Sequence, residues 1–278
     1  MPDVGRAAAP GRTAVPQTPL ETIPLQRGIL YGPVLSRRLG RSLGLNILPD
    51  EIKVCSMDCR YCPYSWTGML STQAALFSGF LPAKEQVLSE LRGELERLKG
   101  AGTPPDTLTF SGNGEATLHP DFPAIAAGVV SLRDTHASGC RTAILSNSTT
   151  VHLPEIRSAL GLLDDPILKL DTAREATFKA LNGPAKEVDF GALLGGLRTM
   201  GGNFILQALF VRGTVDNSTD EEVADWVRLV KDIHPRSIQI YTLDRGPADR
   251  GLTPVPGDRL RAIASALGRE GLEAYAFV

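Results

Sequence analysis

The chain has 278 residues, of which 42% are hydrophobic and 22% charged, a composition typical of a globular protein that can bury a large core. Its formal net charge of −2 gives no overall basic footprint for nucleic acid, although a local basic patch is compatible with it. The longest apolar stretches are strand-length, short of the roughly 18 residues that a spanning helix needs, so we expect no membrane segment. The N-terminus lacks the apolar run of a secretory signal, and we expect a cytoplasmic protein.

Residues 1–26 contain Ala, Pro, Gly, Thr and Gln without an apolar period. Such a segment buries too little apolar surface to offset the entropy that is lost when it becomes ordered. We therefore predict a disordered N-terminal tail over residues 1–26 and one folded domain over residues 27–278.

The folded region is expected to begin with a strand at residues 42–48 and a cysteine-bearing loop at residues 50–69. A helix should follow from near Pro82, because proline suits the first helical position and the next leucines recur at helical spacing through Leu98. These segments form the first unit of a repeating strand-and-helix pattern.

The same unit recurs along the rest of the chain. The predicted strand and helix pairs are 107–110 with 122–132, 142–145 with 154–160, 167–170 with 190–200, 204–211 with 221–233 and 237–243 with 256–267. The strands are nearly continuous apolar runs, and the helices are long enough for right-handed crossovers. Six such units, with a last short strand at residues 272–278, predict a single α/β domain whose parallel sheet forms a partial (β/α)6 barrel.

Polar and glycine-rich segments follow the predicted strands at the point where each strand ends. Besides the cysteine loop, these segments are 111–115, 146–148, 171–172, 212–213 and 244–246. The carboxyl ends of parallel strands lie on one rim of such a fold, and binding sites form there. We therefore expect these segments to surround a single site.

Three cysteines in the loop, Cys55, Cys59 and Cys62, have the spacing CxxxCxxC. Three soft thiolates on a tight loop can hold three irons of a cubane cluster and leave the fourth iron open. A structural zinc site normally closes with four ligands, and Cys140 is expected on the opposite rim. Zinc with a nearby histidine, and cysteines that bind nothing, remain the alternatives.

This spacing, after the first strand of a repeated βα domain and with Tyr61 just before the third cysteine, resembles the radical SAM superfamily. The resemblance implies that Cys55, Cys59 and Cys62 ligate a [4Fe–4S] cluster. It implies that the amino and carboxylate groups of S-adenosylmethionine (SAM) chelate the open iron, and that Tyr61 lies close to the adenine.

A second motif, Phe110-Ser-Gly-Asn-Gly-Glu115, ends the next predicted strand. Glycines allow close backbone approach, and a carboxylate beside them can accept hydrogen bonds from an ammonium group. The motif resembles the Gly-Gly-Glu-Pro element of the superfamily, which binds the methionine amino group of SAM, so Gly112, Gly114 and Glu115 become candidate SAM-binding residues. Asn113 and Ala116 depart from that element, and an ordinary turn is the alternative.

Further segments resemble a subset of the superfamily that is labelled wyosine-synthetase-like, after enzymes that build a tricyclic base on tRNA. These segments are 31–44, 111–120, 169–171, 207–213 and 241–245, and the likeness covers residues 28–247. The tRNA enzymes of that subset carry additional cysteines for a second cluster, and this sequence has no second cysteine triplet. The resemblance thus implies a single-cluster member and leaves the substrate open.

Five other polar positions are candidates for the site. Ser146 and Asn147 end the third strand, where the family contacts the ribose or carboxylate of SAM; a turn into the next helix is the alternative. Gln207 faces the site or the opposite side, depending on the register of its strand. Lys169 and Asp171 alternate around one residue and could both point into the barrel, with a structural ion pair as the competing explanation.

A local basic cluster, Arg37, Arg38, Arg41 and Lys53, precedes the cysteine loop. It could meet phosphate or carboxylate groups, and a solvated face or internal ion pairs are the alternatives. The sequence does not decide whether these arginines contact a substrate.

The resemblance implies an enzyme that takes an electron from a donor such as flavodoxin or ferredoxin. The enzyme would cleave SAM reductively to a 5′-deoxyadenosyl radical, which abstracts a hydrogen atom from a small molecule, a peptide or RNA. The alternatives are a tRNA-base-modifying enzyme, a glycyl-radical activase and a non-catalytic metal-binding protein. The cofactor supplies the radical chemistry, and the protein binds, orients and excludes water.

Overall fold

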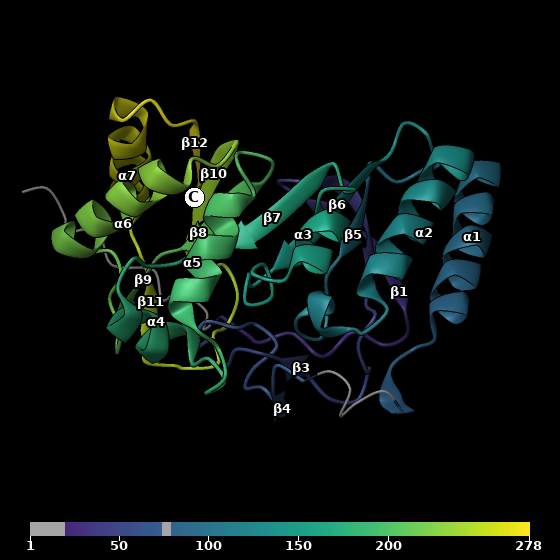
Figure 1. Ribbon diagram of the computed structural model, residues 1–278, viewed down its shortest axis with the longest axis horizontal. Coiled ribbons are helices and arrows are strands. Elements are labelled where there is room, and N and C mark those ends of the chain that lie inside the picture. The colour runs from purple at the N-terminus through teal and green to yellow at the C-terminus, as the bar shows by residue number, and fades with distance from the viewer. Residues whose placement is uncertain (1–19, 74–78) are drawn as a thin grey trace, which may run out of the picture.

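The computed structural model describes residues 20–73 and 79–278. Its main sheet has eight strands in the order β1-β2-β5-β6-β7-β8-β10-β12. β1 (Leu30–Ser36) and β2 (Gly40–Leu45) form an antiparallel hairpin, and every other neighbouring pair in this sheet is parallel. The helices follow the outer side of the curved sheet from α1 at one end to α7 at the other (Figure 1). The α/β fold with a partial barrel, expected from the repeated units, is confirmed.

All six predicted strand-and-helix units are present. The remaining parallel strands are β5 (Thr107–Phe110), β6 (Arg141–Ser146), β7 (Asp165–Lys169), β8 (Ile205–Leu209), β10 (Ser237–Tyr241) and β12 (Ala274–Phe277). The helices of the units are α1 (Lys84–Gly100), α2 (Phe122–His136), α3 (Pro154–Leu160), α5 (Phe190–Thr199), α6 (Asp220–Ile233) and α7 (Gly257–Arg269). The strand expected at 204–211 is divided, because β8 ends at Leu209 and β9 (Val211–Gly213) pairs instead with β11 (Leu252–Pro254).

Other short elements lie around the site. They are β3 (Val54–Cys55), β4 (Met69–Leu70), the 3₁₀ turn η2 (Ala116–Leu118) and α4 (Glu175–Asn182). Neither β1 nor α4 is evident from the sequence pattern. β1 contains Gly32 and Pro33, which usually mark a loop, and it tolerates them because it is an edge strand with an irregular register between Tyr31 and Val34.

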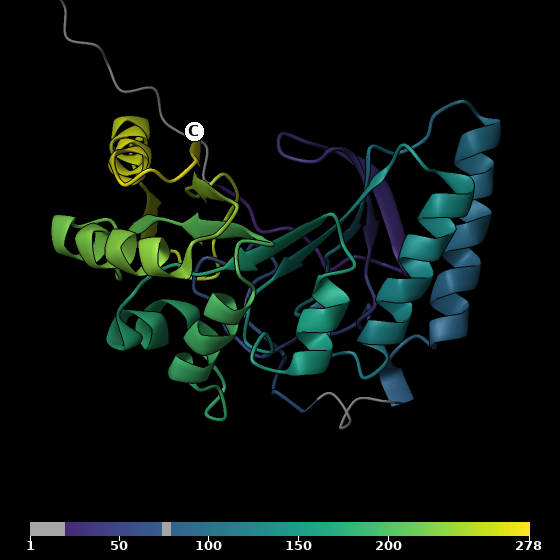
Figure 2. The same cartoon turned by 45° about the horizontal axis from the view of Figure 1, so that its top comes forward.

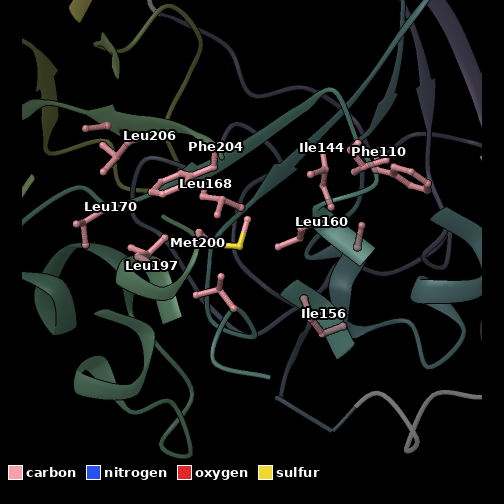
Figure 3. Close-up of a cluster of buried hydrophobic side chains, with 14 of the residues drawn as sticks. Phe110, Ile144, Ile156, Leu160, Leu168, Leu170, Leu197, Met200, Phe204 and Leu206 are labelled. Carbon is pink, nitrogen blue, oxygen red and sulfur yellow. The ribbon is translucent and has the colours of Figure 1, made fainter. Parts of the chain in front are cut away.

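The strands divide their side chains between two faces. Leu168 and Leu206 point toward the helices and pack there against residues such as Leu160 of α3 and Leu197 of α5 (Figure 3). Because side chains alternate along a strand, the neighbouring residues face the barrel interior. That interior is partly polar: the Ser42 and Thr109 hydroxyls are 2.7 Å apart, and Gln207 donates to Gln239 at 3.2 Å. The sheet therefore has an apolar outer core and an inner face that carries functional groups.

The β1–β2 turn spans the open side of the partial barrel. Arg37 donates to the carbonyl of Val278 at 3.2 Å and pairs with Asp244 at 2.9 Å. The Arg38 guanidinium carbon lies 5.7 Å from the centre of the Phe277 ring. In Figure 2 the turn, in purple, extends toward the C-terminus. One edge of the sheet thus reaches the other edge through the two arginines.

The expected N-terminal tail falls only partly within the structure. Residues 1–19 lie outside the described residues. The segment after them is hydrogen-bonded to loops at the carboxyl rim: the carbonyl of Glu21 accepts from the Gly246 amide at 2.7 Å, and the Ile23 amide donates to Pro63 at 2.8 Å. The described part of the predicted tail is therefore anchored to the folded domain.

None of the helices in residues 20–73 and 79–278 is both long enough and apolar enough to cross a membrane.

Candidate active site

The cysteine loop leaves the carboxyl end of β2 and is tied to the rim by its backbone. The pairing of Val54 with Met69 joins the two ends of the loop. Farther along, the Arg60 amide donates to the Leu181 carbonyl of α4 at 3.0 Å, and the Cys62 amide closes a turn onto Cys59 at 3.0 Å. Helix α4, which the sequence pattern did not reveal, therefore supports the loop through its C-terminal turn.

The glycine motif after β5 is bonded directly to this loop. The Val54 amide donates to the Asn113 carbonyl at 3.0 Å, and the Glu115 amide donates to the Val54 carbonyl at 3.1 Å. Gly114 has φ +139°, and a Cβ there would lie 1.7 Å from the Val54 carbonyl oxygen. Only glycine permits this approach. The two motifs that the sequence singled out thus form one structural unit.

The three thiols lie among buried polar groups. Cys55 is buried, whereas Cys59 and Cys62 are half-buried. Asn147 and Asn182 each direct a side-chain amide at a sulfur, at 3.5 Å from Cys55 and Cys59 respectively. Burial raises the pKa of Cys59 to about 11, so a positively charged partner is needed to stabilise its thiolate.

Lys53 provides one such charge at the base of the loop. Its side chain is 4% exposed and donates to the Ser65 carbonyl at 2.8 Å. Burial on its own lowers the pKa of Lys53, but the neighbouring Cys62 and Cys55 outweigh burial and raise it. The structure separates Lys53 from the arginines of the predicted basic cluster and places it beside the thiols.

Three thiols on one loop form a donor set that suits an iron–sulfur cluster. A zinc site gathers its ligands around one ion, whereas each cysteine of a [4Fe–4S] site binds a different iron. Three cysteines on one loop therefore match three irons of a cubane.

Glu115 connects the ends of β5 and β6. Its side chain is 1% exposed; one carboxylate oxygen accepts from the Asn147 amide at 2.5 Å, and the other accepts from the Thr117 hydroxyl at 2.6 Å. Burial raises the pKa of Glu115, while hydrogen bonds from Thr117 and Asn147 oppose this rise. In the same turn, the backbone amide of Ser148 donates a hydrogen bond to the Ser146 hydroxyl at 3.1 Å. Glu115, Ser146 and Asn147 thus lie close together, and Asn147 contacts the cysteine loop at Ser56.

Asn113, which departs from the superfamily pattern, has a structural role. It is fully buried, and its side-chain amide donates to the carbonyls of Gln26 and Pro49, each at 2.9 Å. Its Oδ1 accepts from the Gln26 amide at 2.7 Å. A glycine could make none of these bonds. Asn113 thus fastens the segment before β1 to the site.

Replacing Asn113 with alanine should release the backbone around Gln26. We expect faster hydrogen exchange of the Gln26 amide, because its acceptor is removed, with the cysteine loop changed much less. Asn203→Ala is the matched control, since Asn203 is exposed in a turn far from this segment. Equal exchange at Gln26 in the two variants would contradict the role assigned to Asn113.

A hydrogen-bonded network links the loop to the barrel interior. The Tyr61 hydroxyl donates to Asp171, and Asn182 donates to the same carboxylate at 2.8 Å. The Lys169 ammonium lies 3.2 Å from the other oxygen of Asp171 and donates to Tyr241 at 3.0 Å. Burial on its own lowers the pKa of Lys169, but Asp171 and Tyr241 more than reverse that effect. Lys169 and Asp171 therefore share the inner face as an ion pair that orients Tyr61.

Asn182 is the site residue that sequence reasoning missed. It is 2% exposed at the end of α4 and contacts Cys59, Tyr61 and Asp171. The signal available in the sequence was Gly183, which ends α4 in a left-handed conformation with φ +50°.

A cleft of about 480 Å³ opens beside this network. The predicted site residues that line it are Tyr61, Gly112, Gly114, Lys169 and Gln207. The Tyr241 hydroxyl donates to Gln207 at 3.2 Å, which settles the register of β8: Gln207 faces the interior. Ser146, Asn147 and Glu115 do not line the cleft. The cleft also reaches the arginines of the β1–β2 turn.

An α/β partial barrel with three cysteines on the loop after its first parallel strand is the arrangement that the sequence likened to the radical SAM superfamily. A family model described as the Radical SAM superfamily matches residues 52–230, which is more than half of the chain. The protein belongs to the radical SAM superfamily and is an enzyme of that class, as the cysteine spacing indicated. Members of this superfamily use a [4Fe–4S] cluster and SAM as cofactors.

The sequence is similar to several bacterial and archaeal proteins. It is 30% identical over 220 residues to a Brachyspira hyodysenteriae protein named GTPase Obg, covering 78% of this chain but only 30% of that protein. It is 28% identical over 222 residues to a UPF0026 protein of Helicobacter pylori, covering 78% and 67% of the two chains. A UPF0026 protein of Methanocaldococcus jannaschii is 27% identical over 229 residues, covering 81% and 67%.

Solved structures share the fold at low sequence identity. A radical SAM methyltransferase from Sphaerobacter thermophilus has a TM-score of 0.60 and 14% identity, with 85% of this chain and 65% of that chain covered. Streptococcus suis SuiB bound to S-adenosylmethionine has a TM-score of 0.58 and 15% identity, covering 84% and 50%. TYW1 with a lysine-pyruvate adduct has a TM-score of 0.52 and 14% identity, covering 82% and 73%. These likenesses show the fold alone.

Proposed function

We propose that Cys55, Cys59 and Cys62 hold the [4Fe–4S] cluster and that the protein uses it to cleave SAM reductively. When bound and reduced, the cluster would supply one electron that breaks a carbon–sulfur bond of SAM, giving methionine and a 5′-deoxyadenosyl radical, which abstracts a hydrogen atom from substrate. The observation that carries this proposal is the direct bonding of the cysteine loop to the glycine motif at Val54. That bonding joins the proposed cluster ligands to the proposed SAM site at one end of the cleft.

The chain's own residues would shape the SAM site. Tyr61, held by Asp171 and Asn182, presents its ring at the wall of the cleft. Gly112 lines the same cleft, and a Cβ there would lie 2.6 Å from the Asn46 Oδ1, so this part of the wall needs glycine. Gly114 also lines the cleft, whereas Glu115, Ser146 and Asn147 lie behind it and would position these groups.

Gln207 would act farther along the cleft. It faces the interior between Tyr241 and Gln239 and can orient a substrate or SAM by hydrogen bonds. Enzymes of this class need a reductant, and we propose flavodoxin or ferredoxin in the cytoplasm as the donor. The substrate is proposed to be a small molecule, a peptide or RNA.

The proposal is tested by product analysis. The protein is reconstituted anaerobically with iron and sulfide, reduced with dithionite and supplied with SAM. We expect 5′-deoxyadenosine and methionine to form in equal amounts. Product no greater than that of unreconstituted protein would contradict the proposal.

A further inference from the structure

The three arginines of the β1–β2 hairpin have different surroundings. Arg41 lies outside the cleft, and its guanidinium donates to the Thr103 carbonyl at 3.2 Å. Arg37 lines the cleft but pairs with Asp244. Arg38 also lines the cleft, and its guanidinium carbon lies 4.7 Å from the centre of the Tyr241 ring. Within residues 20–73 and 79–278, no carboxylate forms an ion pair with Arg38.

The charges along the cleft are unequal. Its lining contains four basic residues, Arg37, Arg38, Lys169 and Arg245, and one acidic residue, Asp244. Asp244 is paired with Arg37, and Lys169 is paired with Asp171 beneath the wall. Among the described residues, Arg38 and Arg245 therefore carry the positive charge that no carboxylate neutralises. Burial raises the pKa of the Tyr31 and Tyr64 hydroxyls, and the nearby Arg245 guanidinium acts in the opposite direction and lowers it.

Stacking prepares Arg38 to bind an oxyanion. A guanidinium held over an aromatic face keeps the N–H donors at its edge available, and these donors match carboxylate or phosphate oxygens in pairs. Tyr241 itself is fixed by Lys169 and Gln207, so the platform beneath Arg38 is ordered by the same network that holds Tyr61. The guanidinium edge of Arg38, where an anion would bind, is thus connected to the proposed SAM site through Tyr241 and Lys169.

We infer that Arg38, with Arg245, binds a phosphate or carboxylate group of a small-molecule substrate in the cleft. The inference rests on the proposed function, because it names the substrate class of the same site. A cleft of about 480 Å³ is within the range that accommodates small ligands. The net charge of −2 favours a small anion over a long nucleic-acid strand.

The test measures anion binding without turnover. Reconstituted protein with saturating SAM and no reductant is titrated calorimetrically with inorganic pyrophosphate, with succinate and with a short single-stranded RNA. The first two ligands distinguish phosphate from carboxylate. We expect pyrophosphate or succinate to bind, Arg38→Gln to weaken that binding about tenfold or more, and Arg38→Lys to weaken it less. Arg41→Gln is the matched control and should change it less than about twofold.

Several results would overturn the inference. The inference is wrong if neither small anion binds, or if Arg38→Gln and Arg41→Gln weaken anion binding equally. It is also wrong if RNA binds more tightly than both small anions. If Arg38→Gln loses affinity for SAM, Arg38 binds SAM and not the substrate, which also contradicts the inference. Cluster absorbance of Arg38→Gln should match that of the unsubstituted protein and shows that the variant folds. If anions bind through Arg38 but no 5′-deoxyadenosine forms, the anion site stands and the proposed radical chemistry fails.

Discussion

Changing Cys55, Cys59 or Cys62 to alanine, one at a time, should lower 5′-deoxyadenosine formation by at least about 100-fold. Each thiolate is assigned to a different iron, so the loss of one leaves the cluster without a full set of protein ligands. The iron and sulfide content of each reconstituted variant should fall together with product formation. Both quantities are measured on the same preparation.

Cys140→Ala provides the matched control for these variants. Cys140 is buried just before β6, at the opposite end of that strand from Ser146, and its thiol donates to the Arg141 carbonyl at 3.4 Å. Its removal should leave iron, sulfide and product formation near those of the unsubstituted protein. Equal loss in Cys140→Ala, or full activity in a loop variant, would contradict the ligand assignment.

Asp171→Ala should lower the free energy of unfolding by about 3 kcal/mol, because it removes the carboxylate partner of Lys169, whose side chain is only 16% exposed. Asp171 is 3% exposed, and the Leu209 amide also donates to it, at 2.8 Å. Urea unfolding of the unreconstituted protein measures this change. Adding Lys169→Met to Asp171→Ala should restore part of the loss, since the unpaired charge is then removed.

Asp165→Ala is the control for that experiment because it removes the same residue type from the start of β7, the strand that precedes Asp171. Asp165 pairs with Arg141 and Arg236 at the other rim, where those side chains are 56% and 43% exposed. Water can solvate both arginines after the change, so the expected cost is about 1 kcal/mol. A loss for Asp171→Ala no larger than that for Asp165→Ala would show that the inner pair does not stabilise the barrel.

Much of the fold could be predicted because its strands and helices differ clearly in apolar period. The alternation around Leu170 also predicted that Lys169 and Asp171 share the inner face, and the structure confirms it. β1 was missed because Gly32 and Pro33 obscure an edge strand, and α4 because it is a single short helix inside a long connection. These elements depend on tertiary contacts, which local pattern does not report.

The site could be predicted where motif spacing determines position. Cys55, Cys59 and Cys62 lie on one loop because they are close in sequence, and Gly114 must be glycine because of the Val54 carbonyl. The pairing of Asn113 with Gln26 and the stacking of Arg38 on Tyr241 join residues far apart in the chain. No spacing rule connects such partners. The structural role of Asn113 and the surroundings of Arg38 could therefore be seen only in the structure.

The cysteine loop is proposed to carry a [4Fe–4S] cluster whose open iron binds SAM. Electron paramagnetic resonance of the reconstituted, reduced protein, recorded before and after addition of SAM, examines both parts of this proposal. We predict the signal of a reduced [4Fe–4S] cluster that changes when SAM is added, and no such signal in Cys59→Ala. A cluster signal that SAM leaves unchanged, or bound zinc without sulfide, would contradict the account.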